Sequence, residues 1–185
     1  MRMFVAIDLD EAMKAAVARE QQMAWRLAAQ SPITFVKPEQ AHLTLVFLGE
    51  VASPQCDRVI TAMQEPMAGT ASFDITFGGL GAFPPGGAPR VLWLGLLDGA
   101  REVIAVQRHV AHRLEALGVE LEDRSFHPHL TLGRWRRSVP SDRPAPAADP
   151  RPTGTLHVDR VTLYESRLSS EGPTHIARAH ALFER

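Results

Sequence analysis

The sequence predicts an α+β fold built from two similar halves. The prediction comes from two repeated segments. An apolar strand pattern that ends in aspartate occurs at residues 2–10 (RMFVAIDLD) and again at residues 90–98 (RVLWLGLLD). The tetrapeptide HLTL occurs at residues 42–45 and again at residues 129–132. The first pair of segments is 88 residues apart and the second pair 87. The chain of 185 residues therefore contains one framework twice.

Each apolar strand leads into an amphipathic helix. Apolar side chains recur near helical spacing over residues 11–29 and again over residues 103–117, where Gly118 ends the pattern. Asp10 and Asp98 are suited to capping the two helices. A third helix is expected to begin at Ser53-Pro54 and to end by Pro66.

The remaining segments predict two hairpins and one exposed loop. Strand patterns at residues 73–83 and 90–96 flank a Pro/Gly turn, and patterns at 156–165 and 175–183 flank a turn at 169–173. Between residues 136 and 152 five prolines and no apolar period indicate an exposed loop. We do not place a domain boundary in this loop and expect residues 1–185 to form one domain.

Composition is that of an ordinary globular protein and narrows the choice of partners. Hydrophobic residues form 45% of the chain, and 20 Lys and Arg against 21 Asp and Glu give a net charge of −1. This balance provides no strong attraction for long duplex nucleic acid, although a short RNA end or a small phosphate ester fits. Cys56 has no partner for a disulfide, and no apolar run reaches the roughly 18 residues of a membrane span. We expect a cytoplasmic protein.

The repeated tetrapeptide has the properties of a catalytic motif. Residues two apart in a strand share a face, so each histidine points with its threonine, while the leucines face the core. If the halves pack about a pseudo-twofold axis, His42 and Thr44 face His129 and Thr131 across a groove. In-line displacement at phosphorus needs a base and an acid on opposite sides, and two histidines supply both near pH 7. The threonine hydroxyls can donate to phosphate oxygens. No metal or cofactor is required.

A structural explanation of the motif also exists, because His-x-Thr is common in strands and duplication can preserve it as framework. The fifth residue after each histidine differs: Phe47 in one half and Arg134 in the other. An arginine can hold a phosphate and an aromatic ring can stack on a base. Strict alternation along a strand places both residues on the face opposite the histidine. Arg134 therefore needs a twist or a bulge to reach the histidine's face, and Gly133 is suited to either. Phe47 could equally be a core residue.

The chain resembles the two-histidine phosphoesterase superfamily, specifically its bacterial and archaeal RNA 2′,3′-cyclic phosphodiesterase branch, also called 2′-5′ RNA ligase. The resemblance covers nearly the whole chain. It rests on the following segments: residues 2–8 (RMFVAID), 36–50 (VKPEQAHLTLVFLGE), 81–84 (GAFP), 90–93 (RVLW), 126–134 (FHPHLTLGR), 163–166 (LYES) and 171–173 (EGP).

The resemblance implies a bilobal fold with an antiparallel sheet in each lobe and both motifs in the cleft between them. It also implies hydrolysis of a 2′,3′-cyclic phosphate to a 2′-phosphate, with O3′ leaving, and a weaker capacity to ligate such an end to a 5′-hydroxyl. His42 would protonate the leaving oxygen and His129 would activate water, although sequence alone cannot assign these two roles. Thr44, Thr131 and Arg134 would bind phosphate, and Phe47 the base.

One departure from the family concerns the chain after Gly172-Pro173, where the family usually has a tyrosine and this chain has Thr174-His175. This puts a tyrosine contact from that loop in doubt.

Alternative substrates and a non-catalytic function remain open from the sequence. The expected substrates are RNA 3′ ends with a 2′,3′-cyclic phosphate, including tRNA fragments. Small cyclic nucleotides or an ADP-ribose cyclic phosphate would suit the same chemistry. A module that holds RNA ends such as tRNA halves without turnover is the alternative of another class. His109 and His112 are three apart on a predicted helix and more typical of a solvated face than of a metal site. We expect a monomer.

Overall fold

The computed structural model describes residues 1–27, 31–122, 125–145, 147–169 and 172–184. Its elements follow one another as β1 (Arg2–Asp8), α1 (Glu11–Leu27), β2 (Ile33–Phe35), β3 (His42–Glu50), α2 (Ser53–Ala62), β4 (Met67–Ala71), β5 (Phe73–Phe83), β6 (Val91–Asp98), α3 (Ala100–Glu115), β7 (Leu130–Trp135), β8 (Pro152–Val158), β9 (Arg160–Ser169) and β10 (Gly172–Glu184), with single 3₁₀ turns at Pro38–Gln40 and Pro140–Asp142. The mixture of strands and helices confirms the predicted α+β class.

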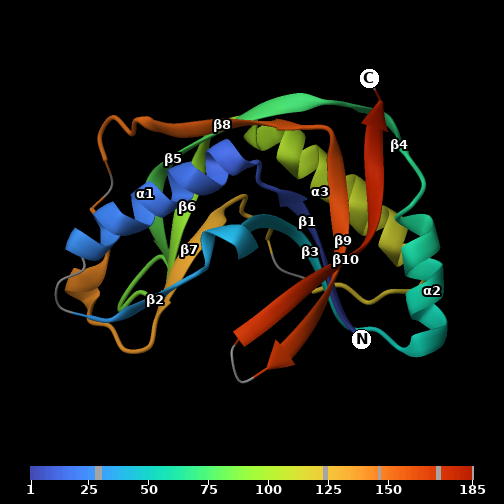
Figure 1. Ribbon diagram of the computed structural model, residues 1–185, viewed down its shortest axis with the longest axis horizontal. Helices are drawn as coiled ribbons and strands as arrows, with labels where there is room; N and C mark the ends of the chain where they lie inside the picture. Colours follow the sequence, from blue (N-terminus) through green and yellow to red (C-terminus); the bar gives the residue numbers. More distant parts are fainter. Residues whose placement is uncertain (28–30, 123–124, 146, 170–171, 185) are drawn as a thin grey trace.

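Two five-stranded sheets form the two lobes seen side by side in Figure 1. The first sheet has the strand order β3-β1-β9-β10-β4 and the second has β2-β7-β6-β5-β8. Neighbouring strands run antiparallel except that β4 runs parallel to β10. In each sheet the strand with a histidine motif pairs with the strand that opens the repeat, β3 with β1 and β7 with β6. The duplication predicted from the sequence is therefore present in the sheets.

Each lobe is covered by the helix that follows a strand of the other lobe. α1 follows β1 of the first sheet but packs on β8 of the second, and α3 follows β6 of the second sheet but packs on β3 of the first (Figure 1). The side-chain amide of Gln21 on α1 donates to the carbonyl oxygens of Val36 and Leu132, at 2.7 and 3.0 Å. This exchange of helices links the two halves of the chain.

The core consists of the apolar faces that the periodic patterns indicate. On α3 the buried residues are Val103, Val106, Val110 and Leu114, spaced at three and four. On α1 the helical spacing likewise buries Met13 and Val17. Cys56 is buried, as a small apolar residue would be, and its thiol donates to the Val51 carbonyl oxygen.

Several details differ from the sequence prediction. The strand predicted over residues 156–165 is two strands in different sheets, β8 and β9, because the chain crosses between the lobes at Asp159. Asp10 caps α1 by accepting a bond from the Met13 amide, whereas α3 is capped by Gly99 and not by Asp98. Residues 28–29 of the first predicted helix and residues 170–171 of the predicted turn lie outside the described part of the chain.

The predicted loop is confirmed over its described residues. From residue 136 to 151 they form one 3₁₀ turn and no strand or longer helix, and residue 146 lies outside the description. Among the described residues no helix is long and apolar enough to cross a membrane.

Candidate active site

The two HLTL segments have the same alternation of faces. Leu43 and Leu45 are buried, as are Leu130 and Leu132, while each histidine and threonine is half-buried on the opposite face. His42 begins β3 and His129 stands immediately before β7. These two strands contact each other where the two sheets meet. The motifs therefore occupy matching positions on adjoining strands, on the faces turned away from the core.

Each histidine ring is held by the same backbone contact. Nδ1 of His42 lies 2.8 Å from the carbonyl oxygen of Gln40, and Nδ1 of His129 lies 2.7 Å from that of His127. A carbonyl oxygen only accepts hydrogen bonds, so Nδ1 must carry the proton in both rings. In the neutral imidazole Nε2 is then the free basic nitrogen. Both side chains are thus oriented to exchange a proton through Nε2.

Burial lowers the pKa of both histidines below the usual 6.5, and the nearby carboxylate and guanidinium distinguish the two rings. At His42 desolvation is the largest cause, the bond to Gln40 and the Asp8 carboxylate oppose it, and His175 adds to it. At His129 desolvation is again the largest cause, the bond to the His127 carbonyl oxygen opposes it, and the His127 and Arg134 side chains lower the pKa further. His42 therefore has a carboxylate beside it that favours its charged form, whereas His129 has a guanidinium that favours its neutral form.

A β-bulge follows both motifs at the same place. In the pairing of β1 with β3, Thr44 and Val46 face consecutive residues of β1, which leaves Leu45 as the extra residue. In the pairing of β6 with β7, Thr131 and Gly133 face consecutive residues of β6, which leaves Leu132 extra. The extra carbonyl oxygen of Leu132 accepts bonds from the Val36 amide and from Gln21. The bulge reverses the alternation after each motif.

The bulges bring the fifth residue after each histidine to the histidine's face. Phe47 is 53% exposed, which excludes the interpretation of it as a core residue. Its ring lies 6.1 Å from that of Phe4, which itself stacks on His42 at 4.8 Å. Arg134 is exposed and close enough to His129 to lower its pKa. The predicted need for a bulge at Gly133 is therefore met.

Aromatic rings surround His42 beyond those predicted. Phe4 stacks on it, and the ring of His175 meets it edge-on at 5.3 Å. Tyr164 stacks on Phe4 at 5.2 Å and its hydroxyl donates to Asp8; burial, together with this bond, raises the pKa of Tyr164. We call each motif histidine and the rings around it a half-site. His175 reaches the His42 half-site from β10, the strand in which the family pattern has a tyrosine.

A matching aromatic group surrounds His129. Phe83 meets its ring edge-on at 5.0 Å and Trp93 lies 6.3 Å away. His127 lies 6.4 Å from His129 and packs against both of these rings. His127 therefore belongs to the aromatic wall.

The other histidine pair singled out in the sequence lies away from these half-sites. His109 on α3 is within 3.3 Å of the Thr70 hydroxyl, consistent with a helix surface. Within the described ranges no three metal-binding side chains gather into a group.

Comparison with known proteins places the chain in the family that its sequence motifs resemble. Residues 11–169 match the model of the 2′-5′ RNA ligase superfamily. The chain belongs to this superfamily. A relative from Archaeoglobus fulgidus, named RNA 2′,3′-cyclic phosphodiesterase, is 33% identical over 95% of this chain and 96% of its own length. The matched residues of the family model include both HLTL segments.

Solved structures of related proteins share the arrangement of the two lobes. A protein of Thermus thermophilus is 27% identical and superposes with a TM-score of 0.75, covering 98% of this chain and 97% of its own. E. coli LigT, solved in complex with 3′-AMP, is 27% identical with a TM-score of 0.70, covering 100% of this chain and 98% of its own. The two-lobed fold is therefore that of the superfamily.

Sequence reasoning did not identify the residues that orient the motif side chains. Phe4, Phe83 and Trp93 resemble ordinary core residues in strands, and Asp8 follows an apolar run like any strand end. Their position beside the histidines depends on pairing between strands far apart in the chain. The segments RMFVAID, GAFP and RVLW of the family pattern contain all four of these residues and are the signal that could have identified them.

Proposed function

We propose that this protein hydrolyses 2′,3′-cyclic phosphate ends of RNA to 2′-phosphates without a metal ion. The observation that supports this most is the matched pair of histidines, each with Nδ1 bound to a backbone carbonyl and Nε2 free. The names of relatives such as the one from Archaeoglobus fulgidus and the LigT complex with 3′-AMP support the substrate class. The same site would join such an end to a 5′-hydroxyl when that hydroxyl takes the place of water as the nucleophile and O3′ leaves.

In the proposed mechanism His129 is the general base and His42 the general acid. Nε2 of His129 removes a proton from water as its oxygen attacks phosphorus. Nε2 of His42 gives a proton to O3′ as the bond from phosphorus to O3′ breaks. The neighbours support this assignment, because Asp8 favours a protonated His42 and Arg134 favours a neutral His129. After one turnover the two protonation states are exchanged and solvent restores them.

Four further side chains are proposed to bind the substrate across a cleft between the lobes. The hydroxyls of Thr44 and Thr131 share the histidine faces and would donate to the non-bridging phosphate oxygens. Arg134 would neutralise the developing charge, and the exposed ring of Phe47 would stack on the terminal base.

We further propose that the 185 residues act as one bilobal domain, since α1 and α3 each cover the sheet of the other half. The enzyme would work as a monomer in the cytoplasm. Its substrates there would be RNA fragments, including those of tRNA, whose 3′ ends carry a 2′,3′-cyclic phosphate. Light scattering of the purified protein tests the monomer, and sequencing of RNA ends that accumulate without the enzyme tests the tRNA substrate.

Product analysis after incubation with EDTA tests the proposed reaction. The protein is incubated with adenosine 2′,3′-cyclic phosphate and with an oligoribonucleotide that ends in one, and the phosphate isomer is identified. We expect 2′-phosphate from both at a rate that EDTA does not change. A 3′-phosphate product, or activity abolished by EDTA and restored by a divalent metal, would contradict the mechanism. Tight binding of ends without turnover would favour the binding module.

A further inference from the structure

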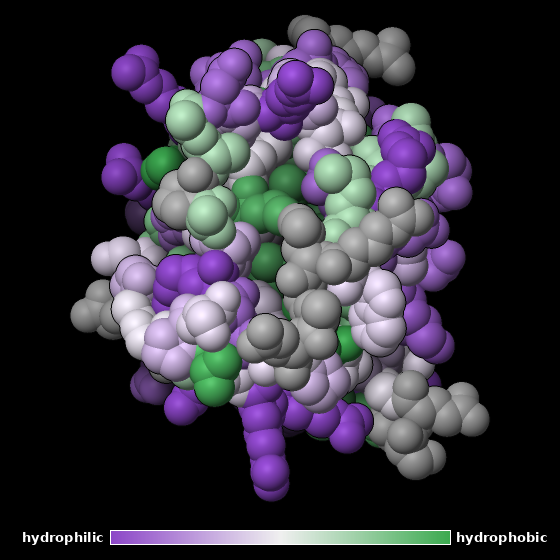
Figure 2. Space-filling model, turned by 90° about the vertical axis from the view of Figure 1, so that its left-hand side faces the viewer, coloured by the Kyte–Doolittle hydropathy of each residue, from purple (hydrophilic) through white to green (hydrophobic). Residues whose placement is uncertain are grey.

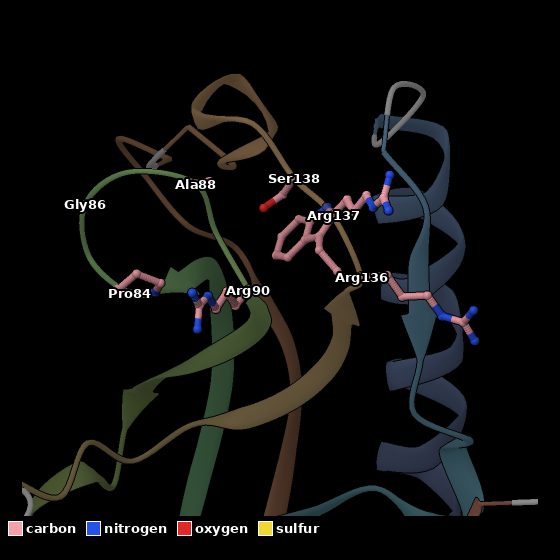
Figure 3. A pocket seen from close by; sticks show the side chains of 8 residues that line it. Pro84, Gly86, Ala88, Arg90, Arg136, Arg137 and Ser138 are labelled. Carbon is pink, nitrogen blue, oxygen red and sulfur yellow. The ribbon is translucent and has the colours of Figure 1, made fainter.

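A concave site lies at the end of strands β5, β6 and β7, beyond the half-site of His129. Its volume is 770 Å³, within the range of ligand sites in proteins. Its walls are the loop between β5 and β6 and the segment that follows β7 (Figure 3), and Trp135, the last residue of β7, also lines it. Figure 2 looks onto the side of the molecule on which this lobe lies and shows hydrophilic side chains along much of its outer edge.

The walls of this pocket are fixed to each other by side-chain bonds. Arg143 donates to the carbonyl oxygens of Ala82, Pro84 and Gly87, at 3.1, 2.7 and 3.0 Å. The hydroxyl of Ser138 donates to the Pro89 carbonyl oxygen. A pocket connected in this way is formed before any ligand arrives, which lowers the entropic cost of binding.

The pocket carries positive charge that nothing in the described chain neutralises. Arg90, Arg136 and Arg137 are exposed and line it, and none of the three forms an ion pair with another described residue. The nearby carboxylate of Asp142 accepts a bond from the Val139 amide at 2.7 Å and is used within its own turn. The chain as a whole has a net charge of −1, so this concentration of arginine is local.

The three guanidinium groups lie at the rim of the pocket and do not converge on one point. In Figure 3 the side chain of Arg90 lies on the side of the β5–β6 loop, whereas those of Arg136 and Arg137 lie on the opposite side and extend outward, away from that loop. One phosphate ion could not contact all three. A row of charges of this kind matches a polymer with one negative charge at each repeat.

The pocket adjoins the His129 half-site through two pairs of consecutive residues. Phe83 packs on His129, and the next residue, Pro84, lines the pocket. Arg134 acts on His129, and the next residue, Trp135, also lines the pocket. A strand rises about 3.3 Å per residue, so the backbone positions of Thr131 and Arg136 are roughly 16 Å apart, a distance that a few nucleotides span.

We propose that this pocket, which we call the arginine pocket, binds the phosphodiester backbone of the RNA strand whose cyclic end lies at the two histidines. The inference rests on the proposed function and extends it, because it makes single-stranded RNA the preferred substrate over a mononucleotide. Its arginines contact phosphates a few nucleotides before the reacting end and take no part in proton transfer.

The test compares two substrates in the variant Arg136→Gln/Arg137→Gln. We measure kcat/KM for adenosine 2′,3′-cyclic phosphate and for a ten-nucleotide RNA that ends in a cyclic phosphate. The ratio of the RNA value to the mononucleotide value is expected to fall about tenfold. The slope of log(kcat/KM) against log(salt) for the RNA should become shallower by about 1.4, as expected from the loss of two phosphate contacts at roughly 0.7 each.

The control variant Arg101→Gln/Arg108→Gln removes the same charge from the exposed face of α3 and should leave the ratio unchanged. A ratio that stays at its wild-type value in the pocket variant, or falls equally in the control, overturns the proposal. If the wild-type protein turns over neither substrate, the proposed function is wrong. The arginine pocket is then judged by anisotropy binding of the same RNA, which the pocket variant must weaken about tenfold and the control must not.

Discussion

Replacing Gly133 with alanine tests whether the bulge in β7 positions Arg134. A Cβ at this position would lie 2.6 Å from Cγ2 of Ile33, 3.0 Å from the Thr34 carbonyl oxygen and 3.1 Å from Cδ1 of Phe35. Contacts this short require the neighbouring atoms to move, and one of them is with backbone. Strand β2 must therefore shift away from β7, and the bulge shifts with it.

The size of the effect follows from these contacts. Overpacking of this kind costs about 1–3 kcal/mol of stability. A charge-assisted hydrogen bond from Arg134 to phosphate is worth about 1.5–3 kcal/mol, so its loss lowers kcat/KM roughly 10- to 100-fold. We expect the first loss in a urea denaturation curve and the second in kinetics with a cyclic-phosphate RNA, at a temperature where both proteins are folded.

Two controls separate positioning from general destabilisation. Val59→Ala empties a buried site on α2, in the other lobe, and should lower stability by about 2 kcal/mol while leaving kcat/KM unchanged. In an Arg134→Gln background the Gly133→Ala change should cost little further activity, because the contact it disturbs is already absent. An equal loss of kcat/KM in both backgrounds would refute the positioning role of the bulge.

The remaining predictions concern pH and the base. Because burial lowers the pKa of both histidines, the bell-shaped profile of kcat/KM should have its optimum below pH 6.5, measured by initial rates across a buffer series; an optimum above pH 7.5 would contradict this. Asp8→Asn removes a carboxylate that raises the pKa of His42, so loss of activity on the alkaline side should begin at lower pH than in the wild type. An unmoved alkaline limb would mean that His42 is not the acid. Phe47→Ala should raise KM roughly 5- to 100-fold by removing a stacking surface, with little change in kcat or in melting temperature, and an unchanged KM would exclude base stacking there.

The fold was largely predictable because its duplication is visible in the sequence. The repeated strand and the repeated HLTL predicted two similar lobes, and the HLTL alternation predicted which strand faces point outward. The division of residues 156–165 into β8 and β9 was not predictable, because the apolar pattern continues through Asp159 and only the position of the second sheet separates the two strands. The crossing of α1 and α3 to the opposite lobes likewise depends on packing and leaves no periodic signal.

The candidate site was predictable in its motifs and not in its environment. The sequence showed that strict alternation would place Arg134 on the face opposite His129. Gly133 indicated the bulge that brings it to the same face. The equivalent bulge after Thr44 contains no glycine and therefore gave no signal, so the exposure of Phe47 came only from the structure. The near symmetry of the two motifs also gave no reason to propose one histidine and not the other as the acid, because Asp8 and Arg134 reach the rings through pairing and bulging.

Leaving-group rescue is the most direct test that two histidines act on opposite sides of one phosphorus atom. The substrate is a 2′,3′-cyclic phosphate with sulfur in place of O3′. Because a thiol has a pKa of about 8.5, the sulfur can depart as a thiolate without receiving a proton. His42→Ala and His129→Ala should each lower kcat on the oxygen substrate by about 10² to 10⁴. On the sulfur substrate His42→Ala should recover most of its activity and His129→Ala should not. Recovery of both variants, or of neither, would contradict the assignment of one acid and one base.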